Sequence, residues 1–246
     1  MKKLWITLVI AGLAANGFAQ NFNAGINLKS AYISRGATFN DGPVIQGYAE
    51  VANIPMPGNT GSLTVGLWAN YDINDFSATY SEAQDGTVSE IDWYLTYCAP
   101  FEAVDLSITY TEYTYPHGTT TDKEVIVTLG KAIAETGLYA SFSAYYGIDD
   151  AYYDNSWYLK AALDYEKALT EKLTGTLGAS VAYDMADTRQ NGWNDASLSV
   201  GASYALTEHL SLNGSLAYIA QLDDDILINA EHQVDLLSSI GLSVSF

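Results

Sequence analysis

The last eleven residues of the chain alternate between apolar and small polar side chains and stop on an aromatic ring. Leu236, Ile240, Leu242, Val244 and Phe246 are apolar, and serine or glycine fills most of the positions between them. A period of two gives a β-strand one apolar and one polar face. In a barrel that spans a bilayer the apolar face contacts lipid and the polar face lines a wet interior. The alternative is a soluble sandwich, in which the apolar face covers a dry core.

The N-terminus has the organisation of a secretory signal peptide. Lys2 and Lys3 precede an apolar run over residues 4–15, and Gly17 and Ala19 supply the small residues of a cleavage site. The run is too short to cross a bilayer as a helix, which needs ~20 residues. An uncleaved N-terminal anchor is the alternative. We therefore expect two segments, a cleaved signal peptide over 1–19 and one barrel domain over 20–246.

The chain is strongly acidic. Its net charge is −19, and removal of the signal segment leaves 8 basic residues against 29 acidic ones, a net charge of −21. Such a chain repels nucleic acid and favours cationic solutes. Cys98 is the single cysteine, so an intrachain disulfide and a thiolate metal site are both excluded. No His or Cys spacing of a metal site occurs, and no cofactor is implied.

Alternating, strand-like runs recur along the whole chain after the signal segment. Most have the ~10-residue length that a tilted strand needs to cross a membrane. No run is long and apolar enough for a membrane helix. The twelve predicted strands cover residues 22–33, 43–53, 61–72, 88–98, 103–114, 123–132, 137–147, 156–167, 172–184, 195–206, 209–220 and 234–246.

The connections between these strands alternate in length. Short links follow every second strand, and longer polar segments follow the others, namely 34–42, 73–87, 115–122, 148–155, 185–194 and 221–233. Short turns at one end and long loops at the other are typical of bacterial barrels, with the turns periplasmic and the loops extracellular. The predicted fold class is all-β, a transmembrane antiparallel up-and-down barrel of about twelve strands in the outer membrane.

Placing the apolar faces outward assigns a polar set of side chains to the lumen. Acidic residues gather on the second to eighth strands, and small hydroxyls follow on the later ones. Charges in a narrow pore act strongly on a passing ion, so this set predicts a preference for cations or polar solutes. The alternative is that these side chains pair with each other and fill the interior. The predicted pore-lining residues are Lys29, Gln46, Tyr48, Glu50, Asp72, Glu90, Asp92, Tyr94, Asp105, Glu124, Tyr158, Lys160 and Asp164.

Catalytic arrangements find little support in the sequence. His117 and His232 fall in predicted loops and His209 in a predicted turn, so none lies on a strand beside a lumen or rim serine. A glycine-rich phosphate loop is also lacking. No catalytic residue is assigned, and an enzymatic role is not expected.

Two segments resemble known outer-membrane proteins. Tyr32, Arg35 and Gly36, followed by Pro43 and the pair Gln46 and Gly47, resemble the opening of the TorF family of porins. The last strand, ending on Phe246, resembles the C-terminal signature of outer-membrane barrels. The first resemblance implies an outer-membrane location and a pore-like role, and names no solute.

The motif residues also have structural interpretations. Arg35, at the end of the first strand, is expected to reach Glu50 or Asp72 and fix the first loop. Gly36 is expected to adopt a positive φ at the loop entry. Pro43 opens the second strand, where a missing N–H does least harm.

The functional hypothesis is a passive channel for small polar or cationic solutes. Its main competitor is a non-conducting structural or adhesive barrel that acts through its extracellular loops. The expected partners are outer-membrane lipid and lipopolysaccharide, the barrel assembly machinery through the C-terminal strand, and small polar solutes; nucleic acid is not among them.

Overall fold

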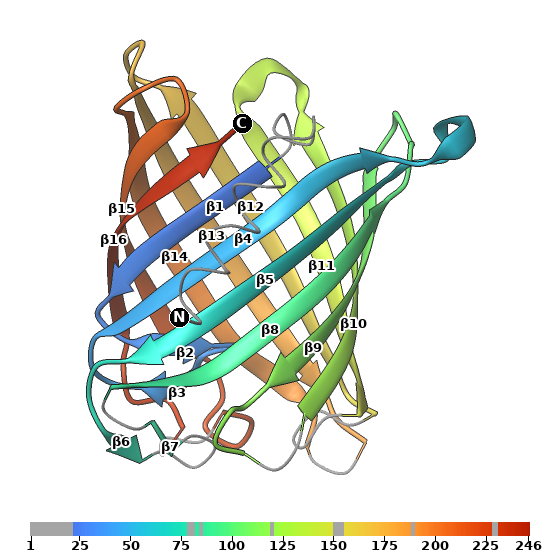
Figure 1. The fold of residues 1–246 in the computed structure, drawn as a ribbon. Coiled ribbons are helices and arrows are strands. Elements are labelled where there is room, and N and C mark those ends of the chain that lie inside the picture. Colours follow the sequence, from blue (N-terminus) through green and yellow to red (C-terminus); the bar gives the residue numbers. More distant parts are fainter. Residues whose placement is uncertain are drawn as a thin grey trace, which may run out of the picture.

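The structure is a computed structural model, and it describes residues 22–77, 82–83, 86–118, 121–149, 155–187, 190–227 and 231–246. The predicted signal peptide over residues 1–19 lies outside the described residues. Within them the chain forms one closed barrel of antiparallel strands that surrounds a central lumen (Figure 1).

Twelve strands make the barrel, and each pairs with its neighbours along the chain. The circle closes where β1 pairs with β16, from Asn23 opposite Ser245 to Lys29 opposite Ser239. The barrel strands are β1 (Phe22–Lys29), β4 (Val44–Pro55), β5 (Ser62–Asp72), β8 (Thr87–Cys98), β9 (Asp105–Thr114), β10 (Thr121–Ile133), β11 (Leu138–Asp149), β12 (Trp157–Ala168), β13 (Leu173–Met185), β14 (Gly192–Ala205), β15 (Leu210–Gln221) and β16 (Leu236–Ser245).

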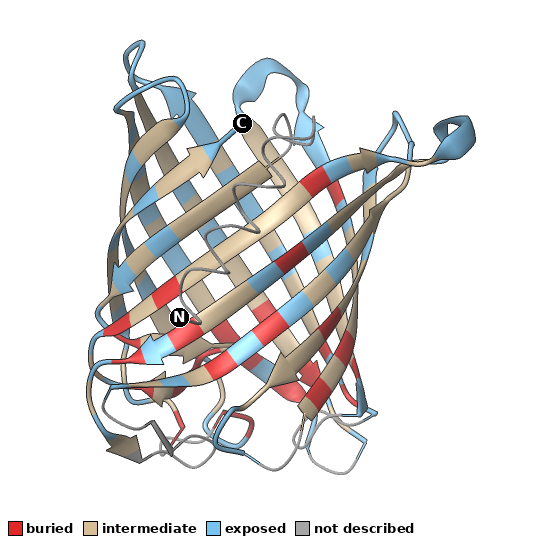
Figure 2. Cartoon of the chain, in the orientation of Figure 1, coloured by how far each residue is buried: buried red, intermediate tan, exposed pale blue. Residues whose placement is uncertain are grey.

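The two-residue period of the sequence decides which side chains face out. On β14, Leu198 and Val200 point away from the barrel and are 63% and 50% exposed, while Ser197 and Ser199 point inward. The same alternation continues around the barrel, where exposed segments recur along the strands (Figure 2), and many of the exposed residues are Leu, Ile or Val. Exposed leucine and valine in such numbers are unfavourable in water and favourable in hydrocarbon. Among the described residues, no helix is long and apolar enough to cross a membrane.

The two ends of the barrel differ. Short connections close one end, called the turn end here, and include the 3-10 turns η2 (Pro57–Asn59) and η3 (Ala134–Thr136). Both chain ends of the barrel meet there, where the Phe246 amide donates to the Phe22 carbonyl at 3.0 Å. The opposite end, the loop end, carries the longer connections and two added hairpins (Figure 1).

The added hairpins are β2 (Tyr32–Ser34) with β3 (Ala37–Asn40), and β6 (Phe76–Ser77) with β7 (Glu82–Ala83). The twelve predicted strands and the barrel fold are confirmed, but these hairpins were not predicted. The predicted first strand over 22–33 breaks after Lys29, and its last residues belong to β2 instead.

The buried part of the molecule is mostly polar and concentrated at the loop end, where red segments gather in Figure 2. A soluble domain buries mainly apolar side chains, but a membrane barrel turns those toward lipid. The largest fully buried side chains are Glu124, Val44, Asn40, Asn70, Asn194, Asp72 and Asp184.

Candidate functional site

The hairpin β2–β3 folds from the end of β1 into the loop end of the lumen. Its turn consists of Arg35 and Gly36, both with positive φ, 50° and 79°. A Cβ on Gly36 would lie 2.5 Å from Leu227 Cδ2, so glycine is required for close contact as well as for the backbone conformation. The predicted positive φ of Gly36 is confirmed.

Arg35 at the tip of the hairpin crosses the lumen to the far wall. Its Nη2 donates to both carboxylate oxygens of Glu124, at 2.6 Å and 2.5 Å. Glu124 lies on β10, which is five strands from β1 around the barrel in one direction and seven in the other. The prediction that Arg35 reaches Glu50 or Asp72 is wrong, because the hairpin carries the guanidinium across the barrel rather than along the near wall.

Two aromatic rings and a second donor lie beside this ion pair. The Arg35 guanidinium carbon lies 5.0 Å from the ring centroid of Tyr145 and 5.2 Å from that of Tyr158. The Tyr113 hydroxyl donates to Glu124 at 2.9 Å. The Glu124 side chain is fully buried, so the pair lies where charge interactions are strong.

Strand β3 is joined to the segment that precedes β16. The Thr38 amide donates to the Glu231 carbonyl at 2.7 Å, and the Thr38 hydroxyl accepts from the amides of Gln233 and Val234 at 3.0 and 3.2 Å. This side of the hairpin is therefore attached to the barrel rim over several residues.

The tip is also held through its backbone. The Asn194 amide group donates to the Arg35 carbonyl at 2.7 Å, and Nδ1 of His232 lies 2.8 Å from the Gly36 carbonyl. The second ring nitrogen of His232 contacts Asp235 at 2.8 Å. His232 was predicted in an extracellular loop without a role. In the structure its ring contacts the hairpin backbone and helps to hold the tip.

Strand β2 contacts the wall on the other side. The Tyr32 hydroxyl donates to Glu90 at 2.7 Å, and its ring packs against Trp68 with centroids 5.6 Å apart. Burial and then the nearby carboxylates of Glu90 and Asp92 raise the pKa of Tyr32 well above its usual value, so it remains a neutral donor. At the base of the hairpin, Asn40 donates to Asp72 at 2.9 Å.

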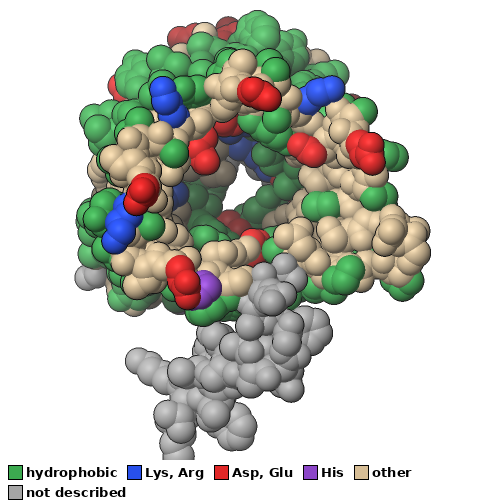
Figure 3. Space-filling model, turned by 90° about the horizontal axis from the view of Figure 1, so that it is seen from above, with side chains coloured by type: hydrophobic (Ala, Val, Ile, Leu, Met, Phe, Trp, Pro, Cys, Tyr) green, Lys and Arg blue, Asp and Glu red, His purple; other side chains and the backbone are tan. Residues whose placement is uncertain are grey.

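Toward the turn end, polar side chains pair along the wall instead of across the lumen. The Thr96 and Thr109 hydroxyls are 2.8 Å apart on adjacent strands, and the Thr128 and Ser143 hydroxyls are 2.9 Å apart. Because such bonds join neighbouring strands, they satisfy the polar side chains of the wall without filling the lumen. Figure 3, seen from above, shows a hollow at the centre of the barrel.

Inward tyrosines in this half lie over glycines of neighbouring strands. Tyr94 on β8 covers Gly66 on β5 and donates to Glu50 on β4 at 2.6 Å. Tyr139 on β11 covers Gly130 on β10 in the same way and donates to Asp105 on β9 at 3.0 Å. A ring that lies along the wall occupies little of the lumen, so these glycines keep space open.

All thirteen predicted pore-lining residues occupy inward positions of the strand register, but their surroundings divide them into two groups. Those near the hairpin are buried: Gln46, Asp72, Glu90, Asp92, Glu124 and Tyr158. The others are half-buried or exposed: Lys29, Tyr48, Glu50, Tyr94, Asp105, Lys160 and Asp164.

Sequence reasoning missed Trp68 and Asp195. Trp68 shares the inward face of β5 with Asn70 and Asp72, so the alternation itself could have identified it. Asp195 accepts from the Tyr158 hydroxyl at 2.7 Å and shares the inward face of β14 with Ser197 and Ser199, so the same alternation could have placed it in the lumen.

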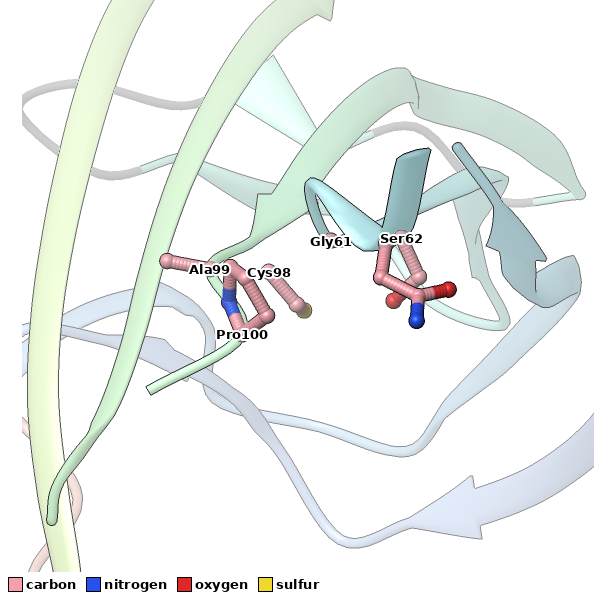
Figure 4. Close-up of a pocket in the computed structure, with 6 residues that line it drawn as sticks. Gly61, Ser62, Cys98, Ala99 and Pro100 are labelled. Atoms are coloured by element: carbon pink, nitrogen blue, oxygen red, sulfur yellow. The ribbon is translucent and has the colours of Figure 1, made fainter. Parts of the chain in front are cut away.

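A separate pocket of about 310 Å³ lies at the turn end, between η2 and the link after β8 (Figure 4). Its lining is Asn59, Gly61, Ser62, Cys98, Ala99 and Pro100. It has no charged side chain, and it lies away from the polar groups of the lumen.

The histidine contacts do not form a nucleophile pair. Nδ1 of His209 contacts the Ser245 carbonyl at 2.9 Å, and its ring stacks on Phe246 with centroids 4.8 Å apart. His232 contacts a carbonyl and a carboxylate, as described above. A serine hydroxyl is therefore not the partner of either ring.

The barrel is similar to solved outer-membrane channels. The KdgM porin shares 10% identity with a TM-score of 0.55, covering 91% of this chain and 99% of that one. The NanC porin shares 13% identity with a TM-score of 0.52, covering 92% and 98%. An outer membrane channel from Pseudomonas putida F1 shares 10% identity with a TM-score of 0.57, covering 92% and 95%.

The outer membrane phospholipase A from Escherichia coli has a comparable likeness, with 10% identity and a TM-score of 0.52 over 95% of this chain and 97% of that one. No family model matches the chain, and no curated protein matches it in sequence. At these sequence identities the similarity shows a shared fold and nothing finer. The closed twelve-stranded barrel and its exposed apolar surface show that the protein is an outer-membrane β-barrel.

Proposed function

We propose that the protein is a porin-like channel through which small polar or cationic solutes diffuse across the outer membrane. The observation that carries this proposal is the polar, unfilled half of the barrel at the turn end, whose hydrogen bonds run along the wall. A barrel with only a structural role has no need to hold inward tyrosines over glycines.

The charge of the lumen supports a preference for cations. Lys29 and Lys160 are the basic side chains on the described inward strand positions. The acidic side chains on described positions that face the lumen include Glu50, Asp72, Glu90, Asp92, Asp105, Asp122, Glu124, Asp164, Glu166, Asp184 and Asp195. In a low-dielectric tube this excess raises the local concentration of cations and lowers that of anions.

The KdgM porin has been solved in complex with disordered oligogalacturonate, which is a polyanion. The acidic wall described here is unsuited to such a solute. The proposed solutes are therefore small, and neutral or cationic, even though the two barrels share a fold.

The hairpin β2–β3 sets the size limit. It crosses the loop end and contacts the wall on both sides, through Tyr32 and through Thr38. Solutes of the size of large oligomers do not pass such a crossing. The same contacts are the observation that favours the competing function, a non-conducting barrel that acts through its extracellular loops.

Several finer features belong to the same proposal. The motif of Tyr32, Arg35 and Gly36 with Pro43, Gln46 and Gly47 supports kinship with TorF-type porins. Delivery by a cleaved signal peptide over 1–19, insertion by the barrel assembly machinery through the strand ending at Phe246, and contact with lipopolysaccharide complete it.

The test is ion selectivity of the purified protein in planar bilayers. We expect discrete conductance steps and a reversal potential biased toward cations. Replacing the exposed lumen acids in D105N/D164N should lower the cation-to-anion permeability ratio at least twofold. E112Q removes one charge from the outward face of β9 and is the matched control. Silent bilayers would favour the non-conducting barrel, and an unchanged ratio would remove the cation preference.

A further inference from the structure

The far wall of the lumen contains a complete receptor for a guanidinium group, and Arg35 occupies it. One guanidinium nitrogen donates to both oxygens of the Glu124 carboxylate. The ring centroids of Tyr145 and Tyr158 lie 5.0 and 5.2 Å from the guanidinium carbon. A buried carboxylate with aromatic faces beside it is the set of groups that binds this planar cation best.

The receptor belongs to the barrel and not to the hairpin. Its three residues lie on adjacent strands, β10, β11 and β12, which pair with one another along the barrel wall, with a register shift between Lys123 and Glu124. Tyr113 on β9 orients Glu124 by donating at 2.9 Å, and Asp195 orients Tyr158 by accepting at 2.7 Å. The geometry therefore does not depend on the hairpin for its position.

The receptor faces the lumen. Arg35 reaches it from the opposite side of the barrel, on a hairpin that begins beyond β1. A solute in the lumen approaches the same groups from the same direction. The contacts with Glu124, Tyr145 and Tyr158 are made by the guanidinium group itself.

From these contacts we propose that Glu124, Tyr145 and Tyr158 form a binding site for guanidinium-bearing solutes, and that the hairpin narrows the lumen by placing Arg35 in it. The binding site itself does not depend on the proposed channel function, but its effect on transport rests on that function. A guanidinium solute that takes the site displaces Arg35 and releases the tip of the hairpin, because one carboxylate cannot hold both cations in this geometry.

Tethering gives Arg35 an advantage over any free solute. A group held on a short chain acts at an effective concentration in the ~mM range or above. The site in the wild-type protein therefore binds a free guanidinium weakly, and removal of the Arg35 side chain should expose its full affinity.

The experiment uses the full chain, folded in detergent, with ethylguanidinium as the probe and propylammonium as the matched control cation. Calorimetry should show that R35A binds ethylguanidinium at least tenfold more tightly than the wild type does, and more tightly than it binds propylammonium. The R35A/E124Q protein should lose this binding. Equal affinity of R35A and R35A/E124Q, or equal affinity for the two cations, would overturn the site.

A second measurement does not need the R35A variant to fold. In the wild type, high concentrations of ethylguanidinium should accelerate amide hydrogen exchange in β3 several-fold more than equal concentrations of propylammonium. Equal exchange in the two salts would also overturn the proposal. The channel function is judged separately in bilayers: binding without conductance retains this site and removes the channel, and conductance without binding does the reverse.

Discussion

Tyr94 lies over Gly66 of the neighbouring strand so closely that a Cβ on the glycine would stand 2.2 Å from the ring's Cζ. From this position the Tyr94 hydroxyl reaches Glu50, two strands away, at 2.6 Å. The glycine thus does more than complete a strand. It decides that a large side chain lies along the wall instead of across the lumen.

Gly66→Ala should therefore narrow the channel. The added methyl group forces the ring of Tyr94 toward the lumen and breaks its bond to Glu50, and overpacking of this kind costs about 1–3 kcal/mol. Single-channel conductance should fall by tens of per cent, and G66A/Y94A should recover it. Gly47→Ala on β4 is the control, since its Cβ would meet its nearest neighbour only at 3.5 Å. Equal conductance of G66A and G47A would contradict this role for Gly66.

Glu124→Gln should free the hairpin. Breaking a buried pair by removing one charge costs about 3–5 kcal/mol, because the remaining charge is left without compensation. Amide hydrogen exchange of residues 37–40 should then accelerate by roughly two to four powers of ten, if exchange follows release of the hairpin. Glu112→Gln is the control: Glu112 lies on the outward face of β9, so its replacement should leave the exchange rate unchanged. A similar effect of both substitutions would show that the ion pair does not hold the hairpin.

The hairpin should also loosen at alkaline pH. The pKa of Tyr32 is raised in the docked hairpin, so the released state loses its proton first, above its usual value of 10.0. Below that value the Tyr32 contribution to docking is fully present, and it declines as the pH rises toward the raised pKa. Exchange in β3 should therefore accelerate above about pH 10 in the wild type.

Tyr32→Phe separates this effect from general alkaline unfolding. The variant loses a hydrogen bond to Glu90 of a kind that contributes about 1.5–3 kcal/mol, so its exchange is faster at neutral pH. Its additional acceleration above pH 10 should be smaller than that of the wild type. The same pH profile in both proteins would exclude Tyr32 as the titrating group.

Phe246→Ala should impair assembly. Phe246 joins the ends of the barrel, with its ring 6.5 Å from Phe22 and stacked on His209, and its amide bonded to the Phe22 carbonyl. The fraction of heat-modifiable, folded protein in outer membranes should fall several-fold. Phe101→Ala is the control, because Phe101 is an exposed phenylalanine in a turn at the same end. If both variants assemble like the wild type, the terminal ring has no role in insertion.

The strands were predictable because lipid imposes a strict rule on them. On β13, Leu173 and Leu177 must face outward while Thr174 and Thr176 face inward, and a period of two is visible in any sequence. The outward face of a barrel is therefore visible in the sequence as a regular apolar alternation. The same rule could have placed Trp68 in the lumen.

The hairpin and the partner of Arg35 were not predictable in this way. β3 has only four residues, and the segment 34–42 carries no alternation long enough to indicate a strand. A loop that folds inward meets residues from β10, β12 and β14, and the order of strands around the barrel, not their order in sequence, decides which are within reach. Proximity along the chain favoured Glu50 and Asp72, but the closed barrel placed Glu124 opposite the tip.

The crossing hairpin makes the two mouths of the barrel unequal, with an electrical consequence. An ion entering from the turn end passes the exposed carboxylates of Asp105 and Asp164 before it meets any obstacle. An ion from the loop end meets the hairpin first. Current driven in opposite directions should differ in size at equal and opposite voltages, so this barrel should rectify.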